Sequence, residues 1–198
     1  MKLEQHTFIS ESFQELVTEA ISFFDGTPFE LLPPSEKFAG PGIYAIYYSG
    51  KTEVYKNIYS ENTPIYIGKA VLPGWRQGRV KLDSKDAALY RRLREHSRNI
   101  DAVNNLDVKD FSCRFVVLPA EQSDLIGTLE AALIRKYNPL WNSYIDGFGN
   151  HDPGKGRYNQ AKSEWDVLHE GRKWADKLKG EAPLMELILK KVKKYAGS

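Results

Sequence analysis

The sequence is poor in cysteine and in long apolar segments, and each absence excludes a class of protein. Its single cysteine, Cys113, cannot form a disulfide within the chain. No apolar run is long enough to span a membrane, and Met1–Ser10 lacks the apolar centre of a secretion signal. The cysteine and histidine spacing does not match a structural zinc site. We therefore expect a cytoplasmic protein without a membrane partner.

The size and composition are those of one folded domain. The chain has 198 residues, of which 41% are hydrophobic and 27% are charged. These values suit a soluble globular protein with a sizeable core and argue against disorder. We expect a single domain over residues 1–198.

Charge is separated along the chain although the formal net charge is only +2. Residues 66–100 carry nine basic and three acidic side chains, and residues 155–198 carry eleven and six. Residues 1–65 and 101–154 are acidic in sum. Two basic segments are compatible with a polyanion-binding surface and equally with ordinary solvated helix faces.

Hydrophobic spacing predicts a mixed α and β chain. Residues 10–24 carry apolar side chains at helical spacing, and Asp25-Gly26 ends that helix. A stiff connector over Leu31–Pro34 follows. Three segments read as strands, and Cys113 is expected to be a small packing residue in the third. The strands are expected at 43–48, 64–68 and 111–118, and the later helices at 86–100, 121–137, 160–178 and 183–195.

Glu130 is a candidate metal ligand. In the helix expected at 121–137 its neighbours at helical spacing are apolar: Ile126, Leu133 and Ile134. A carboxylate there needs compensation, which a divalent cation or an arginine partner can supply. A side chain that simply leans out to water fits the same pattern.

Arg92 and His96 are candidates for phosphate chemistry. They stand four residues apart on one face of the helix expected at 86–100, next to its apolar stripe. Arg91, Arg94 and Arg98 add further cations, and guanidinium groups suit phosphate oxygens. An ordinary basic helix face and a packed histidine would give the same sequence.

The two strand tyrosines make the pattern specific. Gly42-Ile43-Tyr44 and Tyr66-Ile67-Gly68 lie in consecutive expected strands, followed by the helix with Arg92 and the helix with Glu130. This order resembles the GIY-YIG nucleases over roughly residues 40–145. Within that family, Arg92 with His96, Glu130, and Asn142 after Asn138–Trp141 most resembles the type II restriction endonucleases that cut CCGCGG.

The resemblance implies an α+β fold with a small three-stranded antiparallel sheet flanked by helices. It also implies metal-dependent hydrolysis of double-stranded DNA. By this resemblance Tyr44 activates or positions the attacking water, Arg92 binds the phosphate and Glu130 holds the metal. Tyr66, His96 and Asn142 complete the site, and Lys69 supplies a cation beside the tyrosine.

The residues themselves are compatible with this chemistry. A phenol with a pKa of about 10 is a poor base at neutral pH, so Tyr44 needs a nearby cation such as Lys69, Arg92 or a metal. Only Glu130 stands out as a metal carboxylate, which predicts one Mg²⁺ per site, held mostly by water, with Mn²⁺ able to substitute. DNA-binding candidates lie in both basic segments: Arg76, Arg79, Arg91, Lys155 and Arg157.

The resemblance also organises the rest of the chain. It gives a nuclease core at 40–145, an N-terminal helical arm at 1–39 and a C-terminal loop with basic helices at 146–198. Residues 49–64 are an insertion between the tyrosine strands, and residues 146–156 form a loop that reads equally as a base-contacting segment or as flexible solvent-facing chain. A palindromic site would call for a homodimer, with the helix at 10–24 and the insertion as its candidate interface.

Two other functions fit the same residues. One is a GIY-YIG nuclease of DNA repair or of mobile-element homing. The other is a noncatalytic DNA-binding module that retains the fold, although the joint presence of Tyr44, Tyr66, Arg92, Glu130 and Asn142 argues against loss of the site.

Overall fold

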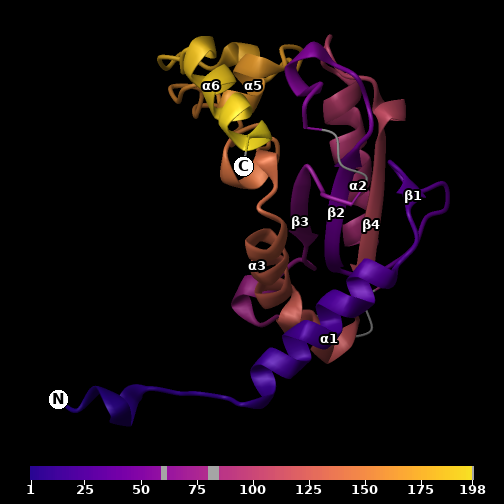
Figure 1. The fold of residues 1–198 in the computed structure, drawn as a ribbon, viewed down its shortest axis with the longest axis vertical. Helices are drawn as coiled ribbons and strands as arrows, with labels where there is room; N and C mark the ends of the chain where they lie inside the picture. Colours follow the sequence, from indigo (N-terminus) through magenta and orange to yellow (C-terminus); the bar gives the residue numbers. More distant parts are fainter. Residues whose placement is uncertain (59–61, 80–84, 198) are drawn as a thin grey trace.

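The fold is built on a four-stranded antiparallel sheet (Figure 1). The structure is a computed structural model that describes residues 1–58, 62–79 and 85–197. The strand order is β1-β4-β2-β3, and every neighbouring pair is antiparallel. This architecture confirms the predicted α+β class. The strands are β1 (Glu30–Leu31), β2 (Gly42–Tyr48), β3 (Tyr66–Ala70) and β4 (Phe111–Val117).

The prediction of three strands was wrong by one short edge strand. β1 comes from the segment expected to be a stiff connector, and its two residues pair with Cys113 and Ser112 of β4. The backbone on the outer edge of β4 pairs with these two residues, although their own sequence does not favour a strand. Cys113 is fully buried, as predicted, and its thiol donates a hydrogen bond to the carbonyl of Leu31 at 3.3 Å.

Helices cover both faces of the sheet (Figure 1). Because side chains alternate along a strand, Ile43 and Tyr47 of β2 pack towards α1 and α3, whereas Tyr44 and Ile46 pack towards α2. β2 is therefore buried on both faces. The helices are α1 (Ser12–Gly26), α2 (Ala88–Asp101), α3 (Ile126–Tyr137), α4 (Leu140–Ser143), α5 (Glu164–Leu168) and α6 (Met185–Ala196).

Two expected helices are shorter in the structure. The helix expected from residue 121 begins as an α-helix at Ile126, because residues 120–125 form a 3₁₀ turn. The helix expected at 160–178 is wrong in most of its length, since α5 ends at Leu168. Gly171 has a φ of 145° and lies directly against the backbone of Ala102, so no side chain could occupy this position and the expected helix cannot continue through it.

The chain after residue 145 packs into the same core as β2 and α2. Trp141, Phe148 and Trp165 form an aromatic cluster, with ring centroids 4.5 Å apart for the first two. β2 and β3, the strands that carry Tyr44 and Tyr66, therefore pack against residues both before and after position 145. Within the described residues, no helix has the length and apolar character needed to cross a membrane.

A buried tyrosine–histidine pair joins the 49–64 insertion to this C-terminal region. The Tyr55 hydroxyl bonds to His169 Nε2 and accepts a hydrogen bond from Trp141 Nε1 at 2.9 Å. His169 Nδ1 lies 2.8 Å from Asn105 Oδ1, so both ring nitrogens have partners. Burial, with a smaller contribution from Arg172, lowers the pKa of His169 to about 3, which keeps the ring neutral.

Candidate active site

Tyr44 and His96 form a second buried tyrosine–histidine pair, between β2 and α2. Both residues are fully buried, and the Tyr44 hydroxyl lies 2.5 Å from His96 Nε2. The hydroxyl also packs directly against Gly68 of β3, where any Cβ would overlap with it. The glycine after Tyr66-Ile67 therefore provides the space that Tyr44 needs.

Burial keeps this pair uncharged. It raises the pKa of Tyr44 well above its ordinary value, and the neighbouring Tyr66 raises it further while Arg92 lowers it. Burial also lowers the pKa of His96 well below its ordinary value, and the Arg92 guanidinium acts in the same direction. The sequence-based expectation that nearby cations favour a Tyr44 phenolate is thus opposed by desolvation in the DNA-free protein. His96 Nδ1 is buried without a partner among the described residues.

Tyr66 on β3 lies beside this pair. Its ring centroid is 6.2 Å from that of Tyr44 and 4.9 Å from that of Phe148. Burial raises its pKa, and Arg92 lowers it. A Cβ on Gly149 would come within 2.6 Å of the Tyr66 hydroxyl, so the loop containing Phe148 and Gly149 closes tightly over the tyrosine.

Arg92 connects the tyrosines to that loop. Its Nη1 donates to Glu95 Oε2 at 2.7 Å, and its Nη2 donates to the Gly149 carbonyl at 2.8 Å. Only 14% of its side chain is exposed. Burial acts to lower the pKa of Arg92, but Tyr44 and Glu95 outweigh it and raise the pKa above its ordinary value. The guanidinium is therefore charged and held in place.

Glu130 and Lys69 form an ion pair at the sheet edge. Lys69 Nζ lies 2.6 Å from Glu130 Oε2, and the exposed fractions of the two side chains are 36% and 19%. Glu130 acts electrostatically on both Tyr44 and Tyr66. Because Lys69 points to the α3 face of β3 and Tyr66 to the α2 face, the site wraps around this edge strand.

Asn142 holds the strand that carries Tyr66 and Lys69. Its Nδ2 donates to the carbonyl of Ile67, and its Oδ1 accepts from the backbone N–H of the same residue, both at 2.8 Å. These paired bonds fix the outer edge of β3 as a neighbouring strand would. In this structure Asn142 acts on the backbone of the site.

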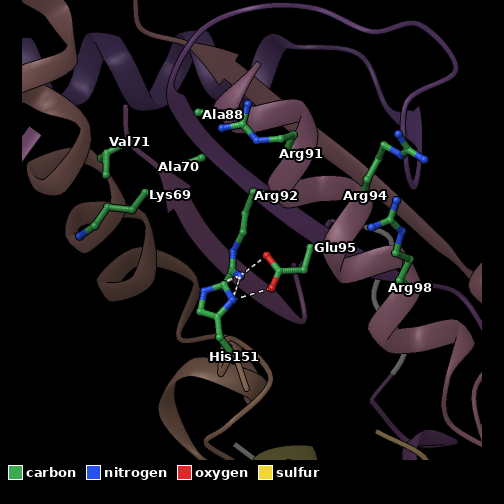
Figure 2. Close-up of a pocket in the computed structure, with 10 residues that line it drawn as sticks. All are labelled: Lys69, Ala70, Val71, Ala88, Arg91, Arg92, Arg94, Glu95, Arg98 and His151. Atoms are coloured by element: carbon green, nitrogen blue, oxygen red, sulfur yellow. Dashed lines mark hydrogen bonds and ion pairs between the residues drawn. The ribbon is translucent and has the colours of Figure 1, made fainter. Parts of the chain in front are cut away.

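A cleft of about 750 Å³ lies beside these groups, and Lys69 and Arg92 form part of its lining (Figure 2). Its walls include Lys69 from β3 and Arg92 from α2, and His151 reaches in from the loop after α4. Three more arginines of α2 line it: Arg91, Arg94 and Arg98. The cleft therefore combines a basic wall with the buried tyrosines behind it.

A family model described as the Eco29kI GIY-YIG domain matches residues 36–196 of this sequence. The chain belongs to this GIY-YIG restriction endonuclease family. A comparison with curated proteins finds no match. Family membership makes the chain a nuclease and implies that it binds DNA.

The GIY-YIG site contains one carboxylate suited to a metal. Divalent-metal dependence is typical of GIY-YIG nucleases. Glu130 offers a hard oxygen ligand near both tyrosines, and within the described part of the chain no group of three or more potential ligands gathers. One carboxylate with water completing the shell is an arrangement that magnesium accepts. The residues present therefore fit a single ion at Glu130.

The other DNA-binding candidates of this GIY-YIG chain are spread over the surface. Arg91 is held by Asp86 through two hydrogen bonds of 2.8 and 3.0 Å. Arg79, Lys155 and Arg157 are exposed, and they are not among the described residues lining the cleft. The side chain of Arg76 lies outside the described residues.

Sequence reasoning missed the groups that hold the 147–151 loop against the site. Arg172 is buried and pairs with Asp166 at 2.6 Å. It also donates to the backbone carbonyls of Gly147, Phe148 and Asn150. In the sequence Arg172 is a single arginine between Trp165 and Trp174, and no local pattern indicates that it contacts this loop. Glu95, three residues after Arg92, could have been found from helical spacing.

Proposed function

We propose that this chain is a sequence-specific type II restriction endonuclease. It makes double-strand breaks in DNA by metal-dependent phosphodiester hydrolysis, at a palindromic GC-rich site such as CCGCGG. The family match supports the nuclease class, and the resemblance of Arg92, His96, Glu130 and Asn142 to the enzymes that cut CCGCGG supports the choice of site. The chain acts as a single domain, and we expect it in the cytoplasm.

One observation carries the catalytic assignment. Tyr44, His96 and Arg92 meet behind a basic cleft, and Glu130 lies at the sheet edge beside them. A buried charged guanidinium next to two phenols suits a phosphodiester, because attack on phosphorus builds negative charge on its oxygens. These residues come from β2, β3, α2 and α3, so only the folded chain assembles them.

Proton transfer in the proposed mechanism begins at Tyr44. Its oxygen takes a proton from the attacking water while its own proton passes to His96 Nε2, 2.5 Å away. In the DNA-free protein the Arg92 guanidinium disfavours a charged His96. A phosphate bound to Arg92 offsets that positive charge, so substrate binding itself promotes the transfer.

The remaining residues position the reacting groups. Tyr66 lies beside Tyr44 and orients the water, Lys69 holds Glu130, and Asn142 fixes the backbone of β3. Glu130 is the residue that would hold Mg²⁺, or Mn²⁺ in its place. The bound ion would stabilise the charge that develops on the phosphate.

Cleavage of plasmid DNA by the purified protein tests this function. With Mg²⁺ we expect discrete double-strand breaks, and sequencing of the ends should locate all of them at one palindrome. The matched control is the same plasmid with every CCGCGG altered by one base pair, which should stay intact if that site is the target. Cuts confined to branched DNA would instead indicate a repair nuclease, and no cuts would contradict the proposal.

Two-fold symmetry of the DNA site supports a homodimer, with one active site for each strand. The N-terminal arm is the proposed interface. α1 buries Val17 and Phe24 against the sheet but leaves Phe13 exposed, and Phe8 before the helix is 91% exposed. The segment before α1 extends away from the body (Figure 1). Exposed aromatic side chains on a projecting arm suit burial against a second copy.

Sedimentation analysis tests the dimer. The unaltered protein should sediment at twice the chain mass, and a Phe8→Ser/Phe13→Ser variant should sediment as a monomer because its interface loses two aromatic anchors. Leu187→Ser on α6 is the control, since Leu187 is also half exposed but lies outside the arm. A dimer that survives the double substitution would exclude the arm as the interface.

A further inference from the structure

His151 reaches into the cleft from the loop opposite α2 (Figure 2). Its Nδ1 lies 2.5 Å from Glu95 Oε1, and its Nε2 lies 2.9 Å from Arg92 Nη1. The imidazole is thus placed between a carboxylate and the arginine assigned to the phosphate. The assignments of Tyr44, His96 and Glu130 leave it without a role.

The two neighbours determine how the ring carries its proton. A carboxylate only accepts hydrogen bonds, so His151 Nδ1 carries the hydrogen that bonds to Glu95. Arg92 Nη1 lies 2.9 Å from Nε2 and 3.3 Å from Nδ1, so the guanidinium lies over the face of the ring and leaves the Nε2 lone pair, which lies in the ring plane, to another partner. A carboxylate on Nδ1 orients the ring and stabilises the charge that forms when Nε2 is protonated, as in other carboxylate–histidine pairs.

The contacts of Arg92 indicate where a phosphate would meet this ring. In the DNA-free protein Nη1 is shared between Glu95 and His151, and Nη2 bonds to the carbonyl of Gly149. The carboxylate of Glu95 is the strongest of these partners, so a charged phosphate oxygen replaces the contacts with the neutral imidazole and carbonyl before it replaces Glu95. The phosphate on Arg92 then lies next to His151 Nε2.

The other described side chains lining the cleft do not supply a readily transferable proton. Lysine and arginine side chains hold their protons strongly, and the Glu95 carboxylate serves as a hydrogen-bond acceptor for Arg92 and His151. An imidazole ordinarily changes charge near neutral pH, which suits it to proton donation. His96 is fully buried behind Tyr44 and does not line the cleft.

We propose that His151 is the general acid of the reaction and that Glu95 is its positioning residue. This inference rests on the proposed function and assigns the second proton of the same hydrolysis. As the oxygen of water bonds to phosphorus, the bond from phosphorus to the leaving oxygen breaks. The electron pair stays on that oxygen, which takes the Nε2 proton of the imidazolium.

A sulfur substitution in the substrate separates this role from phosphate binding or folding. The probe is a duplex whose leaving oxygen is replaced by sulfur, because a thiolate leaves without protonation. Single-turnover rates with Mn²⁺ are compared for this duplex and the ordinary one. For His151→Ala we expect a loss of about 100-fold on the oxygen substrate and less than about threefold on the sulfur substrate.

Two further variants sharpen the test. His151→Gln keeps a hydrogen-bond donor but no transferable proton, so it should behave like His151→Ala. Glu95→Gln should reduce the single-turnover rate by a smaller factor, and again only on the oxygen substrate. Glu121→Ala is the control, because Glu121 is exposed, lies outside the N-terminal arm and does not line the cleft, so both rates should stay unchanged.

The outcomes separate a failure of the general-acid role of His151 from a failure of the proposed endonuclease function. Suppose that the unaltered protein cuts DNA, and that His151→Ala cleaves both substrates more slowly by the same factor or cleaves both at the normal rate. His151 is then not the general acid, and the endonuclease assignment still holds. If the unaltered protein cuts neither substrate, the proposed function fails and the general-acid role fails with it. Circular dichroism of each variant should match the parent, because His151 is 63% exposed.

Discussion

Replacing Tyr44 with Phe is expected to reduce the single-turnover cleavage rate about 1,000-fold, within the range of lost general acid–base catalysis. The change keeps the buried ring and removes only the hydroxyl that contacts His96. In the proposed mechanism the attacking water then has no oxygen to which it can pass its proton. Rates measured on preformed protein–DNA complexes, started with Mg²⁺, report this step without a contribution from binding.

The second tyrosine–histidine pair gives a matched control for this change. Tyr44→Phe leaves His96 Nε2 unpaired in the core, which should lower the free energy of unfolding by about 1–3 kcal/mol. Tyr55→Phe removes the same kind of bond, to His169, and should cost a similar amount of stability. It should nevertheless cut DNA normally. Equal loss of cleavage in both variants would trace the effect to stability and remove Tyr44 from the chemistry.

Replacing Glu130 with Gln is expected to abolish cleavage, with a loss of at least about 1,000-fold, while DNA binding is retained. The amide keeps the volume of the carboxylate but loses the charge that would hold the cation. Removal of the Lys69 ion pair costs little stability, about 0–1 kcal/mol, because both partners are partly exposed. Fluorescence anisotropy with labelled duplex in Ca²⁺ measures binding, and plasmid assays over a range of Mg²⁺ measure cleavage.

Asp25→Asn provides the control for Glu130→Gln. Asp25 pairs with Lys136 of α3 at 2.6 Å, the same distance as in the Lys69–Glu130 pair, but it lies at the end of α1. Breaking this pair should leave cleavage unchanged. A Glu130→Gln protein that cuts at the normal rate would exclude Glu130 as the metal ligand.

The sequence predicted the central elements of the fold because their local patterns are strong. β2 and β4 are rich in β-branched and aromatic residues, and α2 has a clear apolar stripe through Leu89 and Leu93. The sequence-based prediction of strands and helices was wrong where contacts between distant segments determine the structure. β1 exists only because β4 offers an open edge, and the helix expected to continue to residue 178 cannot pass through Gly171, which meets the backbone of Ala102.

The candidate site shows the same division. Tyr44, Tyr66, Arg92 and Glu130 could be proposed from the sequence, because their order along the expected strands and helices resembles the family. The charge state of Tyr44 could not be predicted from the sequence. Desolvation depends on the packing around the hydroxyl, and the sequence reveals only that cations exist nearby.

The sequence by itself determined that this is a single-cysteine protein with two basic segments that belongs to the GIY-YIG restriction endonuclease family. Only the tertiary structure decided which of these cations meet the site and which other groups join them. His151 is 59 residues from Arg92, yet its ring lies against that guanidinium because Arg172 holds the intervening loop. Such contacts depend on packing between distant segments, and no local pattern of residues encodes them.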